Sequence, residues 1–161
     1  MSFSSPAEVL ELAAETAWLG GRYITHICSE DRKIWHAIDE AIAIGRATKM
    51  PVQLSHAKLA MIDWWGQAPR FIAKLETARR EGINISADID PYEDWHSTLT
   101  VLFPERDFKN PETAQFALKS FAPEEGLRLT QFKPDPSEGW CISSGLENIS
   151  KHIRFSATAL G

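Results

Sequence analysis

The most constraining feature of this sequence is a repeat of strand-like and helix-like segments with a period of roughly thirty residues. Strand-like segments begin near residues 22, 51 and 83, and helical patterns precede or separate them. This period fits a strand, a crossover helix and a return to a neighbouring parallel strand. The order therefore predicts an α/β fold in which residues 22–27, 51–56 and 83–89 are adjacent parallel strands with helices packed on one side.

Helix signals support this order. Ser5-Pro6-Ala7-Glu8 is a capping box with proline at the first helical position. Apolar spacing predicts further helices over residues 30–48 and about 69–81. No glycine-rich phosphate loop follows any strand, which argues against nucleotide binding. Parallel β/α repeats of this kind suit a segment of a (β/α)8 TIM-like barrel, which needs about 250 residues when complete.

The pattern loosens after residue 91. Pro111 opens a helical pattern, and residues 126–132 favour a short strand. From Gly139 onward no period is sustained, so we expect a poorly packed, irregular tail. The predicted division is residues 1–138 as the barrel segment and residues 139–161 as the tail.

Composition restricts the classes of function. The chain has 161 residues, with 43% hydrophobic and 24% charged residues, which is typical of a soluble globular domain. Its net charge of −5 argues against a nucleic-acid partner or an anionic membrane surface. The N-terminus lacks the pattern of a signal peptide, and two cysteines are too few for a disulfide framework. We therefore expect a cytoplasmic protein.

Two strand-like segments end on a histidine. "YITHICSED" carries His26, and "VQLSHAK" carries His56 thirty positions later. The carboxyl ends of parallel barrel strands face the active site, and neighbouring strands lie ~4.8 Å apart. Both imidazoles can therefore reach one metal ion. The alternative is that each histidine bonds to a nearby backbone group.

Other polar residues near these strand ends are weaker candidates. Lys58 is placed to bind an anionic substrate group, or is an ordinary solvated lysine. Asp90 and His96 follow the third strand, where they would do acid–base work, bind polar substrate groups or form a polar turn. Cys28 is a thiolate ligand or an inert cysteine.

The segments "GGRYITHICSED", "MPVQLSHAK" and "DWWGQAPRFIAKLETARREGINISADIDPY" together resemble the N-acyl-D-amino-acid deacylases (D-aminoacylases) of the metal-dependent amidohydrolase superfamily. Four motifs occur in the family order between about residues 4 and 138. The resemblance implies a barrel fold, zinc as the cofactor and hydrolysis of the amide bond of N-acyl-D-amino acids. It also implies that His26 and His56 are zinc ligands and that Lys58 contacts the substrate carboxylate.

The chain departs from the family pattern at several positions. Asp90 stands where the family usually has a tyrosine, His96 near a usual serine, and Cys28 at a usual arginine. These departures fall where substrate would be held, so Asp90 and His96 are candidate substrate-binding residues. A small N-acyl amino acid is the implied partner.

The His-x-His motif and the late catalytic aspartate of the superfamily do not occur in the sequence. This favours a second interpretation, in which the chain is an internal segment with at most a vestigial metal site. Such a catalytically incomplete α/β segment would self-associate through exposed sheet edges and form a homo-oligomer.

Overall fold

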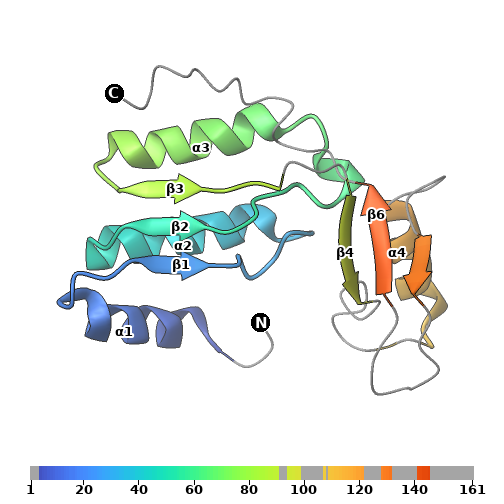
Figure 1. Cartoon of the computed structure of the whole chain (residues 1–161), viewed down its shortest axis with the longest axis horizontal. Helices are drawn as coiled ribbons and strands as arrows, with labels where there is room; N and C mark the ends of the chain where they lie inside the picture. The colour runs from blue at the N-terminus through green and yellow to red at the C-terminus, as the bar shows by residue number, and fades with distance from the viewer. Residues whose placement is uncertain are drawn as a thin grey trace. The chain divides into compact units, whose positions relative to one another are not determined.

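The computed structural model describes residues 4–90, 94–98, 107, 109–121, 128–131 and 141–145. These residues fall into two compact units. Residues 4–59 and 66–90 make up the first, which we call the parallel unit after its strand pairing. Residues 60–65 and the described residues from 94 onward make up the second, which we call the antiparallel unit. Figure 1 shows the elements of each.

The parallel unit alternates helices and strands in the predicted order. Its elements are α1 (Pro6–Ala17), β1 (Tyr23–Thr25), α2 (Ile34–Thr48), β2 (Val52–Leu54), α3 (Ala68–Arg80) and β3 (Ile85–Ala87). Strand β2 lies between β1 and β3, and both pairings are parallel. Tyr23, Val52 and Ile85 are partners across the sheet. The prediction of three adjacent parallel strands is therefore confirmed.

Local signals set the helix starts. The Ser5 hydroxyl accepts a hydrogen bond from the Glu8 amide at 3.2 Å, as the capping box predicts. Helix α2, however, begins at Ile34 and not at residue 30. The Ser29 hydroxyl accepts a hydrogen bond from the Lys33 amide at 3.2 Å, which stabilises a turn before the helix. The predicted start was wrong by four residues, and Glu30 consequently lies in the loop between β1 and α2.

The core of the parallel unit lies between the sheet and its helices. Ile34 and Ile38 of α2 are completely buried, as is Val52 of β2. At Gly45 a Cβ atom would come within 2.7 Å of a Val52 methyl carbon and 2.9 Å of an Ile83 methyl carbon. The absence of a side chain at Gly45 therefore allows α2 to approach the sheet closely.

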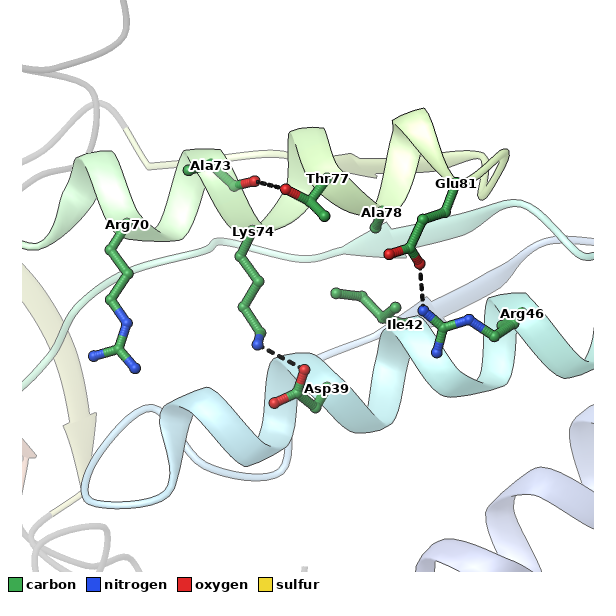
Figure 2. A pocket seen from close by; sticks show the side chains of 9 residues that line it. All are labelled: Asp39, Ile42, Arg46, Arg70, Ala73, Lys74, Thr77, Ala78 and Glu81. Atoms are coloured by element: carbon green, nitrogen blue, oxygen red, sulfur yellow. Dashed lines mark hydrogen bonds and ion pairs between the residues drawn. The ribbon is translucent and has the colours of Figure 1, made fainter.

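Two ion pairs join α2 and α3 on the surface (Figure 2). Lys74 Nζ lies 2.6 Å from Asp39 Oδ1, and Arg46 Nη2 lies 2.5 Å from Glu81 Oε2. They flank a pocket of about 390 Å³ whose lining also includes Arg70. The pocket lining contains none of the residues that the sequence predicts to be functional.

The antiparallel unit contains η1 (Ile62–Trp64), β4 (Asp94–Thr98), α4 (Pro111–Phe121), β5 (Arg128–Gln131) and β6 (Cys141–Gly145). Helix α4 and strand β5 form where the sequence predicts them. Strand β6 corrects an expectation, because it lies in the predicted irregular tail yet pairs antiparallel with both β4 and β5. The division of the chain near residue 139 stays a prediction. None of the helices in the described ranges is both long and apolar enough to span a membrane.

Candidate metal site

His26 and His56 converge at the carboxyl ends of neighbouring parallel strands. His26 directly follows β1, and His56 follows β2 by two residues. The Ser55 amide donates to the Thr25 carbonyl at 2.9 Å, which carries the pairing of the two strands to their ends. His26 Nδ1 then lies 2.9 Å from His56 Nε2, and the ring centroids are 4.6 Å apart. This proximity is what the strand-end spacing predicts.

A turn anchored by Asp88 orients His56. The backbone of His56 has φ of 41°, a left-handed conformation that is costly for a residue with a side chain. Its amide donates to Asp88 Oδ1 at 2.5 Å, and the Ala57 amide donates to the Asp88 carbonyl at 2.8 Å. Gln53 donates to the other Asp88 carboxylate oxygen at 2.8 Å. Asp88 therefore connects the end of β3 to the turn that carries His56.

Glu30 joins the two histidines from the loop before α2. Its Oε1 atom lies 3.2 Å from His56 Nδ1 and 3.7 Å from His26 Nδ1. Glu30 was not predicted as a site residue, because the apolar spacing predicts a helix that already begins at residue 30. The available signal was its position four residues after His26.

Lys58 is buried beside the histidines. The residue is 8% exposed, so the interpretation of an ordinary solvated lysine is wrong. Its ammonium group donates to Glu30 Oε1 at 2.6 Å, to His56 Nδ1 at 2.7 Å and to the His56 carbonyl at 3.1 Å. An ammonium has three donors, and this arrangement gives an acceptor to each.

These contacts determine the tautomer of a neutral His56 ring. Because an ammonium can only donate, His56 Nδ1 accepts from Lys58, and a neutral His56 ring carries its proton on Nε2. That proton faces His26 Nδ1. Desolvation lowers the pKa of His26 below its usual value, His56 and Lys58 lower it further, and Glu30 opposes them. The neutral imidazole that this favours is the form that binds metal ions.

The cluster has the donor atoms that zinc prefers. His26, Glu30 and His56 each offer one ligand atom, and these atoms lie within 4.8 Å of one another. Zinc binds imidazole nitrogen and carboxylate oxygen in proteins. Two nitrogens on tetrahedral zinc are about 3.3 Å apart when the bonds are ~2.0–2.1 Å long. The observed 2.9 Å requires only a small opening of the pair, so the residues fit the ion.

Two other candidates, Asp90 and Cys28, lie outside this cluster. Asp90 is exposed in the loop after β3. His96 belongs to β4 of the antiparallel unit, and its side chain lies outside the described part of the structure. The Cys28 thiol donates toward Glu40 Oε2 at 3.6 Å, and partial burial, reinforced by Glu40, raises the pKa of that thiol. A thiol with a raised pKa is a poor thiolate ligand.

Two curated proteins from Alcaligenes xylosoxydans xylosoxydans are similar to the chain in sequence. An N-acyl-D-glutamate deacylase is 36% identical over 100 residues, which cover 62% of this chain and 20% of that protein. A D-aminoacylase is 31% identical over 85 residues, which cover 53% of this chain and 17% of that protein. The chain thus spans about a fifth of the length of these relatives. No known family profile matches it.

The fold of the chain also matches part of a known enzyme structure. The crystal structure of N-acyl-D-glutamate deacylase from Bordetella bronchiseptica, in complex with zinc and a phosphonate inhibitor, matches with a TM-score of 0.70 at 21% identity. The match covers 93% of this chain and 33% of that one. The resemblance seen in the motifs is confirmed over this segment: the chain is similar in sequence to an N-acyl-D-glutamate deacylase and to a D-aminoacylase.

Proposed function

We propose that this chain supplies part of the active site for zinc-dependent hydrolysis of the amide bond of N-acyl-D-amino acids. One observation carries the proposal: His26 Nδ1 and His56 Nε2 meet at 2.9 Å at the carboxyl ends of two parallel strands, beside the buried Lys58. The relatives support the choice of reaction. The phosphonate in the Bordetella enzyme is described as a mimic of the tetrahedral intermediate of the reaction.

On this proposal β1, β2 and β3 are consecutive strands of a (β/α)8 barrel, with the site at their carboxyl ends. His26 Nδ1 and His56 Nε2 hold the zinc ion. When bound, zinc lowers the pKa of water and polarises a substrate carbonyl. Asp88 contributes indirectly, because it fixes the turn that presents His56.

Lys58 binds the carboxylate of the N-acyl amino acid in this proposal. Its ammonium is a donor-only group held in place by Glu30 at 2.6 Å, so a second carboxylate can share its charge. Asp90 and His96 are proposed to contact polar groups of the substrate. Replacing either residue with alanine should then raise KM more than it lowers kcat.

Hydrolysis of matched substrates tests the reaction. The chain would be stripped of metal, reloaded with zinc and assayed for amine release from N-acetyl-D-glutamate, other N-acetyl-D-amino acids and their L-enantiomers. We expect slow release that requires zinc, prefers the D-enantiomers and is lost in His56→Ala. Equal release by metal-free protein, or equal rates for both enantiomers, would contradict the proposal.

A second candidate function is a catalytically incomplete segment that self-associates. Two observations on the described residues favour it. Their cluster offers only two imidazoles and one carboxylate, and β1 and β3 each pair with a strand on one side only. On β1, Ile24 is 63% exposed. An edge strand with an exposed apolar residue invites pairing with another chain.

Sedimentation of the zinc-loaded chain separates the two candidates. Concentration-dependent association together with negligible turnover would support the incomplete segment. A monodisperse monomer that turns over at ordinary enzyme rates of ~1–10³ s⁻¹ would exclude it.

A further inference from the structure

Several charged groups lie near the two histidines. Among those to which the proposed mechanism assigns no chemical role, Glu30 has the least exposed side chain. Its side chain is 13% exposed, and the side chain of Lys58 is 10% exposed. The same atom, Glu30 Oε1, is 2.6 Å from Lys58 Nζ and 3.2 Å from His56 Nδ1. One carboxylate oxygen thus lies within contact distance of both Lys58, the candidate substrate-binding residue, and His56, a candidate metal ligand.

The hydrogen bonds must change when His56 binds a metal through Nε2. Without metal, Nδ1 accepts from Lys58 and the ring proton occupies Nε2. A metal on Nε2 displaces that proton, and a neutral ring then carries it on Nδ1. Nδ1 can no longer accept from Lys58, and the acceptor within reach is Glu30 Oε1 at 3.2 Å.

We propose that Glu30 is a positioning residue that accepts from His56 Nδ1 in the zinc-bound protein and holds Lys58 in both states. This inference rests on the proposed zinc site. Zinc-binding histidines commonly donate their second N–H to a carboxylate, which fixes the ring and its tautomer. Zinc binding also frees one N–H of Lys58, and this donor becomes available to the substrate carboxylate.

Zinc affinity of the full chain tests the role of Glu30. Calorimetric titration with Zn²⁺ would compare the wild type with Glu30→Gln, Glu30→Asp and Glu40→Gln. Glu40 is a matched control, because it contacts Cys28 and lies outside the histidine cluster. We expect Glu30→Gln to weaken zinc binding roughly 10–100-fold. Glu30→Asp should recover part of the affinity, and Glu40→Gln should bind like the wild type.

The variant Lys58→Met should change the zinc affinity in the opposite direction. In the metal-free protein Lys58 holds His56 in the tautomer that carries a proton on the ligand nitrogen. Removing the ammonium should therefore tighten zinc binding. Weaker zinc binding by Lys58→Met than by the wild type would overturn the inference. If circular dichroism shows that Glu30→Gln does not fold, Lys58→Met still provides the test.

Cobalt absorption distinguishes positioning from direct ligation. At saturating Co²⁺, Glu30→Gln should show the same d–d bands as the wild type, reached at higher metal concentration. A change in the position or intensity of the bands at saturation would mean that Glu30 is itself a ligand, which overturns the inference.

The failures of the two proposals differ. A wild-type chain that binds no zinc refutes the proposed function and the role of Glu30 with it. Tight zinc binding that His56→Ala weakens and Glu30→Gln leaves unchanged refutes the role of Glu30 alone.

Discussion

The two units of this chain differ in how the order of strands in the sheet relates to their order in the sequence. In the parallel unit each strand pairs with the next strand along the chain after one crossover helix. In the antiparallel unit β6 is the last of the described strands in the sequence but lies between β4 and β5. A repeated βα unit leaves a period in the sequence, because strand, helix and return have a fixed length. A sheet whose strand order departs from the chain order leaves no such period.

The largest effect is expected from the core that the period predicts. Ile38 of α2 is completely buried in the parallel unit. Ile38→Ala should lower the free energy of unfolding by about 2–5 kcal/mol, because it removes buried methyl groups and leaves a cavity. Urea denaturation followed by circular dichroism measures this change.

Leu12 on α1 is the matched control, since its side chain is 64% exposed. Leu12→Ala should change the free energy of unfolding by no more than about 0.5 kcal/mol. Similar losses for the two variants would show that the core of the parallel unit is not packed as described.

The next effect concerns the close contact between α2 and the sheet. By helix propensity alone, Gly45→Ala would stabilise the helix by roughly 0.5–1 kcal/mol. The added Cβ would, however, meet methyl carbons of Val52 and Ile83 at 2.7 and 2.9 Å. We expect a net destabilisation of about 1–3 kcal/mol in the same denaturation experiment. A more stable Gly45→Ala variant would contradict the packing.

The helix caps allow a matched comparison of the two units. In α1 the Ser5 hydroxyl accepts from the Glu8 amide at 3.2 Å, and before α4 the Asn110 side chain accepts from the Glu112 amide at 2.9 Å. Ser5→Ala and Asn110→Ala should each cost about 1 kcal/mol. Thermal denaturation of both variants measures this. No effect from Asn110→Ala would indicate that α4 adds little to the stability of its unit.

A smaller effect is expected in the titration of His26. Desolvation by burial, reinforced by His56 and Lys58 and opposed by Glu30, lowers the pKa of this imidazole below its usual 6.5. Below pH 6.5 the unfolded chain then binds more protons than the folded one, so stability contributed by this group falls as the solution is acidified. An NMR titration of metal-free protein should give a midpoint below 6.5 for His26. A midpoint above 6.5 would mean that Glu30 dominates the environment of the ring.

Much of the parallel unit could be predicted from the sequence because independent local signals agree. The capping box at Ser5, the apolar face of α2 and the short strands all point to one architecture. The start of α2 could not be predicted, because the Ser29 hydroxyl replaces the first turn of helix with a hydrogen-bonded turn. Strand β6 could not be predicted either, since its partners are distant in the sequence.

The candidate site likewise has features that the sequence predicts and features that it does not. The convergence of His26 and His56 follows from two local facts, the strand ends and the parallel pairing. The contribution of Asp88 depends on a turn with positive φ at His56, which the residue types do not indicate. The burial of Lys58 depends on the position of Glu30 and therefore on where α2 begins.

The central claim is that His26 and His56 share one zinc ion, and a zinc titration of single variants tests it most directly. Calorimetry would compare the wild type with His26→Ala, His56→Ala and His36→Ala. His36 is an exposed histidine on α2 outside the cluster, so it controls for the loss of any imidazole. We expect the wild-type chain to bind one zinc ion and His36→Ala to bind it with unchanged affinity. In His26→Ala and His56→Ala the zinc affinity should be weaker by roughly tenfold or more. Equal zinc binding by all four proteins would contradict the claim.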